Sequence, residues 1–336
     1  MDKEFKNVTR ADVARLAGVS NTIVSYVINN NRYVDKEKRI RVEEAIKKLN
    51  YRPNNIARAL KGKRSNHILF IADQITNEHF SQIISEMDKY AYNEGYIISL
   101  CENRNSQEFV SQIISRQFDG IVISSISFTE EFIKQFVDAR IPVVLLKNRD
   151  YEHIEGVGTI NTGLYNGAKE CVKHLIAKGR ENILYLDRIS TRGNFSTDND
   201  LRLRGFIEQM KESKLTFSEK NIITGCASEE EVITKIKQRI QEGFQVDGIF
   251  GRNDILACIG MQALKQIGMK IPEDVSVIGF DNSNLSKYTF PTLTTMEIPR
   301  KEIGMSAIKC LHRMIDGGTV PDEVSFSTKL IERDST

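Results

Sequence analysis

The sequence predicts two structural classes in one chain: a small all-α head over residues 1–64 and an α/β body over residues 65–336. The head is basic, with 16 Lys and Arg against 7 Asp and Glu, whereas the body carries 31 against 38. Apolar residues of the head recur at helical spacing on both sides of a glycine, which is typical of helices joined by a tight turn. In the body, short β-rich runs alternate with amphipathic helices, and this indicates parallel sheets covered by helices.

The composition excludes disordered, membrane and exported proteins. Hydrophobic residues make up 40% of the 336 and charged residues 27%, which is enough apolar content for a core. No apolar run approaches the roughly 20 residues that a spanning helix needs. Residues 1–6 carry charges with no apolar core behind them, so they do not form a secretory signal. We therefore expect a cytoplasmic protein that does not contact a membrane.

No motif indicates an enzyme, a cofactor or a metal site. The sequence has no G-x-S-x-G, no H-E-x-x-H, no Walker glycine loop and no dinucleotide-binding fingerprint. The cysteines form no C-x-x-C pair and have no matched short spacings that would predict a disulfide framework or a zinc site. They lie far apart, at Cys101, Cys171, Cys226, Cys258 and Cys310.

The first predicted helix of the head begins after Thr9 and ends before Gly18. The Thr9 hydroxyl and the carboxylate of Asp12, three residues on, can satisfy the amides of the first turn. Gly18 tolerates the positive φ of a tight turn. A third helix begins at Asp35, because its apolar residues follow the i, i+3, i+4, i+7 spacing: Val42, Ala45, Ile46 and Leu49.

The second helix of the head carries the candidate DNA-reading face. Ser20 can cap it, and its apolar residues fall on one side. The opposite side consists of short polar groups and one aromatic: Asn21, Thr22, Ser25, Tyr26 and Asn29. A helix-turn-helix places its second helix in the major groove, where such groups can read base edges. A three-helix cap without a ligand is the alternative, but it leaves unexplained why this face carries no acidic residue.

Residues 50–64 read as a linker with a short helix. Pro53 ends the preceding helix, and Asn54 can cap a helix that ends before Gly62. About seven residues are too few for a stable isolated helix. Four nearby cations suggest that DNA supplies the packing partner.

The head resembles that of the LacI/GalR family of bacterial transcription regulators. The resemblance lies in VARLAGVS at 13–20, TIVS at 22–25, NYRPN at 50–54 and ARAL at 57–60, and it continues almost to the C-terminus. It implies a helix-turn-helix domain at 1–52, a hinge helix and linker at 53–64, and an effector-binding and dimerisation body at 65–336. The family's hinge helix sits in the minor groove, with the leucine matched by Leu60 wedged between base pairs.

The resemblance implies a set of DNA contacts. The family's base-reading positions fall on Asn21, Thr22 and Tyr26, although the family usually has Arg where Tyr26 stands. Together with the capping and hinge positions, the predicted DNA-binding residues are Thr9, Ser20, Asn21, Thr22, Ser25, Tyr26, Asn29, Asn54, Ala57, Arg58 and Leu60.

By its strands alone, the body could form one large sheet or two smaller lobes. The resemblance implies two doubly wound lobes of the periplasmic-binding-protein type. The N-lobe would take about 65–161 and 292–317, and the C-lobe about 162–290 and 322–332. The chain would cross between them near 159–163, 290–292 and 317–322. Ligands of open α/β sheets bind beyond the carboxyl ends of the strands, which here would face a cleft that closes like a hinge.

Polar residues after the predicted strands are the candidates for effector binding. Phe80 could stack on the effector, although an aromatic residue that opens a helix is as often part of the core. Asp254 could cap the helix that follows it. Lys147, Arg188 and Arg202 together would favour an anionic ligand such as a sugar phosphate or sugar acid. The predicted effector-binding residues are Asp73, His79, Phe80, Lys147, Arg202, Asn253 and Asp281.

These features together predict a transcriptional regulator, most simply a repressor of carbohydrate-utilisation genes. A symmetric homodimer would place two recognition helices one DNA turn apart on a palindromic operator. A small sugar or sugar phosphate would control DNA affinity allosterically. We expect a dimer rather than a tetramer, since no leucine heptads follow the last strand pattern. The alternatives are a carbohydrate-binding module, or a regulator controlled by a protein corepressor.

Overall fold

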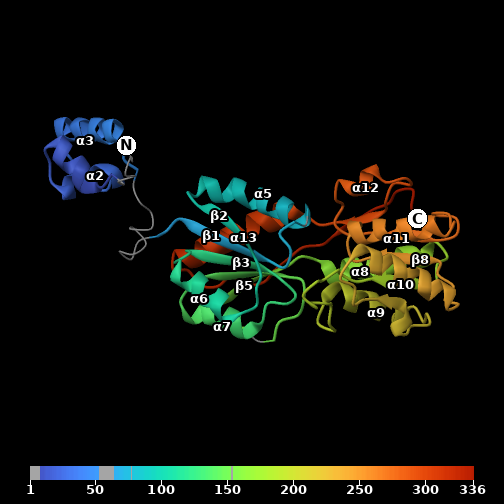
Figure 1. Ribbon diagram of the computed structural model, residues 1–336. Helices are drawn as coiled ribbons and strands as arrows, with labels where there is room; N and C mark the ends of the chain where they lie inside the picture. Colours follow the sequence, from blue (N-terminus) through green and yellow to red (C-terminus); the bar gives the residue numbers. More distant parts are fainter. Residues whose placement is uncertain (1–7, 53–63, 77, 153) are drawn as a thin grey trace. The chain divides into compact units, whose positions relative to one another are not determined.

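The computed structural model describes residues 8–52, 64–76, 78–152 and 154–336 (Figure 1). The chain divides into two compact units, Met1–Ser65 and Asn66–Thr336. The first is all-helical and the second is built on parallel sheets covered by helices, which confirms the predicted fold class. No helix within the described ranges is both long and apolar enough to cross a membrane.

The head consists of α1 (Arg10–Ala17), α2 (Asn21–Asn29) and α3 (Lys36–Leu49). Both predicted N-caps are confirmed: the Thr9 and Ser20 hydroxyls accept hydrogen bonds from the amides of Asp12 and Ile23. Gly18 ends α1 at φ 64°, where a side chain would be strained. The helices enclose a small apolar core whose buried members are Val13, Ala14, Ala17, Val24, Val27, Val42, Ala45 and Tyr51.

The N-lobe is a six-stranded sheet with helices on both faces (Figure 1). Its strand order is β11-β5-β4-β3-β1-β2, and all these strand pairs are parallel. The strands are β1 (His67–Ala72), β2 (Ile97–Glu102), β3 (Gly120–Ser124), β4 (Val143–Lys147), β5 (Val157–Asn161) and β11 (Val324–Ser325). The helices are α5 (Glu78–Asn93), α6 (Gln107–Ser115), α7 (Glu130–Asp138) and α13 (Arg300–Ile315).

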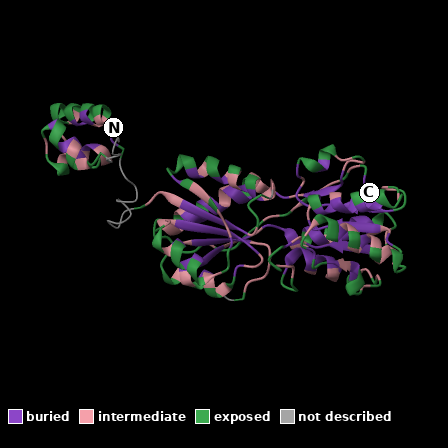
Figure 2. Ribbon diagram, in the orientation of Figure 1, coloured by how far each residue is buried: buried purple, intermediate pink, exposed green. Residues whose placement is uncertain are grey.

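Alternation along β1 shows why both faces of this sheet are covered. Ile68 and Phe70 pack with α5 and α13, whereas Leu69 and Ile71 pack with α6 and α7. All four are at most 2% exposed. Successive side chains of a strand point to opposite faces, so a run of buried residues needs a helical layer on each side. The central strands β1, β3 and β4 therefore lie inside the lobe, whereas the edge strands β2 and β11 are more exposed (Figure 2).

The C-lobe repeats this design around a four-stranded parallel sheet, β7-β6-β8-β9. Its strands are β6 (Ile183–Leu186), β7 (Ile222–Ile223), β8 (Gly248–Gly251) and β9 (Ser276–Ile278). Helices α8 (Leu164–Ala177) and α9 (Leu201–Glu212) cover one face, and α10 (Glu229–Gln241) and α11 (Asp254–Gln266) cover the other. A short helix, α12 (Leu285–Tyr288), follows β9.

The chain crosses between the lobes at three places, two of them later than the sequence suggested. β10 (Thr295–Glu297) pairs with β12 (Lys329–Ile331), and Glu297 also bridges to the C-lobe residue Asp281. The C-lobe thus extends to Glu297, and the second crossing lies at 298–299 rather than 290–292. β11 pairs with β5 of the N-lobe, which moves the third crossing from 317–322 to 326–328. Residues 324–331 contain two short strands, β11 and β12, which lie in different sheets.

Candidate functional site

The outward face of α2 offers two exposed side chains, Asn21 and Thr22, at its first turn. Ser25, Tyr26 and Asn29 lie half-buried beside them. The Asn29 amide already donates to the Ser25 backbone oxygen at 2.8 Å, so it is tied to its own helix. Asn21 and Thr22 are therefore the α2 side chains best placed to form hydrogen bonds with another molecule.

The ring of Tyr26 is in contact with a positively charged side chain. The Arg32 guanidinium carbon lies 5.3 Å from the centre of the Tyr26 ring, within the range of a cation–π contact. Arg32 is exposed and follows the C-cap of α2. A role for Arg32 was not predicted from the sequence, because Arg32 lies beyond the end of α2 and outside its predicted DNA-reading face. Among the predicted DNA contacts, Asn54, Ala57, Arg58 and Leu60 lie outside the described residues. Thr9 and Ser20 act as helix caps.

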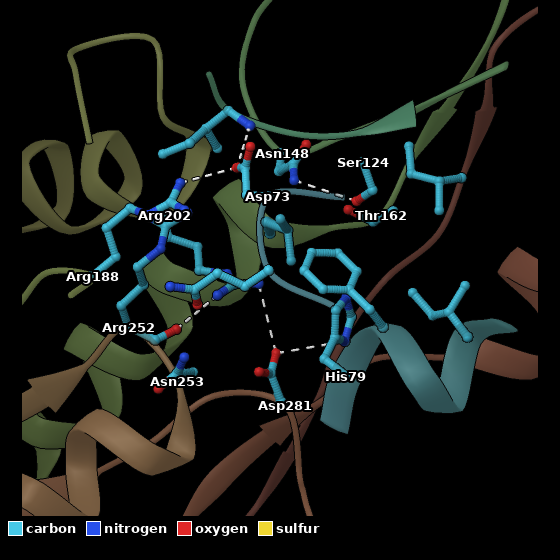
Figure 3. A pocket seen from close by; sticks show the side chains of 16 residues that line it. Asp73, His79, Ser124, Asn148, Thr162, Arg188, Arg202, Arg252, Asn253 and Asp281 are labelled. Carbon is cyan, nitrogen blue, oxygen red and sulfur yellow. Dashed lines mark hydrogen bonds and ion pairs between the residues drawn. The ribbon is translucent and has the colours of Figure 1, made fainter. Parts of the chain in front are cut away.

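A polar pocket lies between the two lobes of the body, beyond the carboxyl ends of both sheets (Figure 3). Six of the seven predicted effector-binding residues line it: Asp73, His79, Phe80, Arg202, Asn253 and Asp281. The other lining residues are Gln74, Ile83, Ser124, Ile126, Leu146, Asn148, Thr162, Leu164, Arg188 and Arg252. Asn148, Thr162 and Arg252 directly follow the last residue of a strand, and Ser124 is the last residue of β3; this position is the signal that could have found them.

Lys147, the seventh predicted residue, does not line this pocket. Its ammonium group pairs with Glu323 at 2.9 Å. Lys147 is the last residue of β4, and neighbouring side chains of a strand point to opposite sides, so Asn148 reaches the pocket instead. Of the three cations that would favour an anionic ligand, only Arg188 and Arg202 therefore line the pocket.

Asp73 joins the two lobes. One of its carboxylate oxygens lies 2.9 Å from Arg188 Nη1 of the C-lobe and also accepts from the Ile126 amide. The other accepts from the hydroxyls of Ser125 and Ser127. Burial opposes ionisation, but the Arg188 charge and these hydrogen bonds hold the pKa of Asp73 below its usual value. Asp73 is therefore an ionised carboxylate whose acceptor positions are already filled.

Asp281 and Arg202 face each other across the pocket, with Oδ1 and Nη2 3.6 Å apart. His79 Nδ1 of the N-lobe lies 3.7 Å from the same carboxylate oxygen. Burial, together with the Arg300 and Arg202 charges, lowers the pKa of His79 well below its usual value, so this imidazole is neutral. Arg202 also stacks over the Phe280 ring at 4.8 Å.

A second buried ion pair fixes the C-lobe wall of the pocket. Asp200 Oδ2 lies 2.7 Å from Arg252 Nη1, and both residues are buried. The other oxygen of Asp200 caps α9 by accepting from the amides of Arg202 and Leu203. Burial opposes ionisation of Asp200, but the Arg252 charge keeps its pKa low. In turn the Arg252 backbone oxygen accepts from Arg202 Nη1 at 2.8 Å, which orients the Arg202 guanidinium.

Asn253, rather than Asp254, caps α11. Its side-chain oxygen accepts from the Leu256 amide at 2.9 Å, which leaves its NH₂ group as the available donor. Asp254 is the first residue of α11 and is buried behind the pocket. Its carboxyl group is bonded to the Ser283 amide and the Thr295 hydroxyl.

The pocket contains buried polar atoms that lack a hydrogen bond to the described protein groups. Asn148 Oδ1, Asp281 Oδ1 and Arg202 Nε are buried and make no hydrogen bond among the described residues. Buried polar atoms are normally paired, so these mark positions for ligand or water partners. The first two can accept from a hydroxyl group and the third can donate to one. The cavity between them is about 60 Å³, smaller than the ~300–1,000 Å³ typical of ligand pockets.

Comparisons with known proteins find a matching family model in each of the two units of this chain. The model of bacterial regulatory proteins of the lacI family matches residues 9–54, and the model of the periplasmic-binding-protein-like domain matches residues 172–336. The chain is 32% identical to the HTH-type transcriptional repressor PurR of Vibrio cholerae, over 97% of both chains. It is 30% identical to the PurR of Pectobacterium carotovorum, over 90% of this chain and 89% of the relative.

Two solved structures share the architecture. The lac repressor dimer bound to operator and the anti-inducer ONPF is 25% identical, with 98% of this chain and 99% of that chain covered and a TM-score of 0.83. A periplasmic binding protein/LacI transcriptional regulator from Alkaliphilus metalliredigens, complexed with D-xylulofuranose, is 29% identical. The match covers 81% of this chain and 99% of that one, with a TM-score of 0.64.

Proposed function

The chain belongs to the LacI family of bacterial regulatory proteins and is a DNA-binding transcriptional repressor; we propose that it binds a palindromic operator as a homodimer and releases or gains DNA when a small sugar-like effector enters its cleft. In this proposal residues 1–52 read the operator, 53–64 form the hinge, and 65–336 bind effector and dimerise. The protein would act in the cytoplasm, where bacterial DNA lies. The observation that carries the proposal is that one chain combines two features: an α2 face that presents Asn21 and Thr22, and a polar pocket between the two lobes of the body.

The operator is read by the exposed first turn of α2 together with the stacked Tyr26–Arg32 pair. The amide of Asn21 and the hydroxyl of Thr22 can bond base edges in the major groove. Arg32 brings a guanidinium to the position beside Tyr26, and guanidinium groups favour guanine.

Thr22→Ala is expected to weaken binding to the cognate operator by about 1–3 kcal/mol and to leave binding to random DNA nearly unchanged. The reason is that a base contact specifies sequence, whereas phosphate contacts supply general affinity. Mobility-shift titrations at fixed salt, on DNA from upstream of the protein's own gene and on random DNA, measure both affinities. Thr216→Ala, an exposed threonine of the C-lobe, is the matched control. Equal losses on both DNAs would contradict a base-reading role.

Two groups of exposed apolar side chains on the body support a homodimer. In the N-lobe, Tyr92 of α5 and Ile97 of the edge strand β2 are 77% and 62% exposed. In the C-lobe, Tyr288 and Phe290, at the end of α12 and just beyond it, are 81% and 101% exposed. Contiguous patches of exposed apolar side chains are typical of an interface. The structurally similar lac repressor is a dimer on its operator.

Phe290→Asp combined with Tyr288→Glu is expected to convert the dimer to a monomer at micromolar concentration, because burying two carboxylates in an apolar interface is unfavourable. Light scattering measures the mass directly, and the monomer should also bind operator at least tenfold more weakly. Lys287→Glu, an exposed neighbour on α12, controls for added charge. A wild-type monomer or a stable tetramer would contradict the proposed dimer.

The pocket chemistry supports a polyhydroxylated effector. Its unsatisfied atoms combine acceptors with a donor, as a sugar with neighbouring hydroxyl groups requires. The similar regulator from Alkaliphilus metalliredigens was solved with D-xylulofuranose. Arg188, Arg202 and Arg252 each face a carboxylate, so a neutral sugar fits the charge balance, and a sugar phosphate would have to displace one of these carboxylates.

Arg202→Met is expected to raise the effector concentration needed for half-maximal response by 10–100-fold, since a hydrogen bond to a charged group contributes about 1.5–3 kcal/mol. The measurement is operator binding titrated with a panel of neutral sugars and sugar phosphates, first on wild type and then on the variant. Unchanged operator affinity without effector is the internal control. If no small molecule of the panel changes wild-type binding, control by a protein corepressor becomes the better account.

A further inference from the structure

Asp281 reaches the pocket from a strained backbone turn. Its φ is 108°, and the next residue, Asn282, has φ 48°. No other two neighbouring non-glycine residues of the described ranges both have positive φ. Asn accepts such an angle more readily than most residues, but 108° at Asp281 lies outside the left-handed helical region. Such angles persist only where surrounding contacts hold them, so this turn depends on bonds from other parts of the fold.

The turn determines where the carboxylate of Asp281 lies in the pocket. Its Oδ1 is buried and makes no hydrogen bond among the described residues. It lies 3.6 Å from Arg202 Nη2 and 3.7 Å from His79 Nδ1 (Figure 3). A rotation of the Asp281 backbone would move this oxygen away from both groups. The conformation of the turn therefore sets the position of an acceptor that a ligand can use.

Arg333 holds this turn from a segment far along the chain. Its Nη2 donates to Asn282 Oδ1 at 2.7 Å. Its Nη1 donates to the Leu293 backbone oxygen at 2.6 Å and to the Ser286 hydroxyl of α12 at 3.0 Å. Because the guanidinium is planar and rigid, these bonds fix the Asn282 side chain relative to α12 and the loop that follows it.

The backbone of Arg333 is fixed as well. Its amide donates to Thr294 Oγ1 at 2.9 Å. Two residues later, the Ser335 backbone oxygen accepts from the Val277 amide of β9 at 2.8 Å, and Ser335 is completely buried. The segment that carries Arg333 is therefore attached to the strand that leads into the turn. A group supported in this way can hold a neighbouring binding residue in one position.

Two arginines bond successive residues of the turn. Arg300 Nη2 donates to the Asp281 backbone oxygen, whereas Arg333 donates to the Asn282 side chain. Because the second bond ends on a side chain, substitution of Asn282 separates it from the other bonds of Arg333.

We propose that Arg333 is a positioning residue for effector binding, which acts through Asn282 to keep the Asp281 carboxylate directed into the pocket. The inference rests on the effector role proposed above for this pocket. Its structural part, the hold of Arg333 on the turn, is measured by hydrogen exchange with no ligand added. Failure of the sugar proposal and failure of the positioning role are therefore distinguishable.

Hydrogen exchange followed by mass spectrometry measures the hold on the full-length protein. Peptides that contain the amides of Asp281 and Asn282 report the turn, because these amides donate to oxygens of β10. The Asp187 amide, which donates to an oxygen of β7, reports the integrity of the C-lobe sheet. Arg333→Met is compared with wild type and with Arg180→Met. Arg180 is the matched control, since it also donates to C-lobe backbone oxygens, but at residues that precede β9.

Exchange of the turn should rise about tenfold or more in Arg333→Met, the equivalent of one hydrogen bond from a charged donor, with Asp187 and the Arg180→Met turn unchanged. Wild-type exchange of the turn in Arg333→Met would overturn the proposal. If the Asp187 amide also exchanges faster, the substitution has loosened the lobe, and Arg333→Lys decides. A single ammonium group cannot replace both arms of the guanidinium, so a turn that stays protected in Arg333→Lys overturns the proposal.

A double-mutant cycle with Asn282→Gly tests the consequence for the effector. Glycine adopts positive φ without strain and offers no side chain to Arg333. Operator binding is titrated with D-xylulose and the other neutral sugars of the panel. Arg333→Met should raise the half-maximal sugar concentration about five- to tenfold in the otherwise wild-type protein, and less than about twofold in the Asn282→Gly protein.

Equal losses in the two backgrounds would show that Arg333 acts only through its bonds to Leu293 and Ser286, and would overturn the positioning role. If no sugar of the panel changes operator binding by the wild type, the sugar effector is wrong. Exchange of the turn in Arg333→Met then decides the role of Arg333 by itself.

Discussion

Asp200→Ala is expected to lower the free energy of unfolding of the body by about 3–5 kcal/mol, the cost of leaving a buried charge without its partner. Asp200 is 1% exposed, and its removal strands Arg252 in the C-lobe interior. The substitution also deletes the N-cap of α9, at a cost of about 1 kcal/mol. Urea denaturation followed by circular dichroism measures the loss.

Two further variants test the cause of this loss of stability. Asp200→Asn keeps an acceptor for the α9 amides and loses only the charge, so it should cost less than Asp200→Ala. Lys169→Met breaks an ion pair whose Glu212 partner is half-exposed, and such surface pairs contribute about 0–1 kcal/mol. A loss below about 1 kcal/mol for Asp200→Ala would show that the lobe relaxes around Arg252 and that the ion pair does not organise the pocket wall.

Asp254 is expected to make the body less stable as the pH rises from 5 to 8. Burial, reinforced by the neighbouring Asp281 charge, raises the pKa of Asp254 to about 7. The folded protein therefore binds this proton more tightly than the unfolded chain, and the stabilisation is complete at low pH and lost as the pH passes the folded value. A shift of this size corresponds to about 2–3 kcal/mol between pH 5 and 8.

Asp254→Asn isolates this effect. The amide cannot titrate, so the difference in unfolding free energy between the variant and wild type should change by about 2–3 kcal/mol over that range, in favour of the variant at pH 8. Taking the difference removes His79 and His174, whose lowered pKa values favour folding as the pH rises towards 6.5. A pH-independent difference would show that Asp254 stays ionised throughout.

The sequence predicted the elements that short-range chemistry determines. The caps at Thr9 and Ser20 depend on residues three apart, and β3 and β8 are runs of buried residues with clear ends. By contrast, β5 does not stand out as a strand in the sequence, because Gly158 interrupts its apolar pattern. In the fold a side chain at Gly158 would collide with Cys310 of α13, so the glycine reflects a contact between distant segments.

Prediction of the pocket residues was limited in the same way, by contacts between segments that are distant in the sequence. Asp73, Arg202 and Asp281 were predicted from their places after strands or at a helix start, together with the family resemblance. Lys147 was predicted, but its neighbour Asn148 lines the pocket, because which of two neighbours faces the cleft depends on where the strand ends. Arg32 went unnoticed since its contact with Tyr26 joins a loop to a helix. Each miss concerns a relation between segments that local spacing does not encode.

The late crossings between the lobes determine when this protein can first become functional during its synthesis. The N-lobe sheet and the apolar face of α5 are covered by α13 and completed by β11, so the first lobe to leave the ribosome lacks its cover until residues 300–325 have been made. Until then its buried face is exposed to water and to other nascent chains. A chain that stops anywhere before this point lacks the helix and the strand that complete the N-lobe.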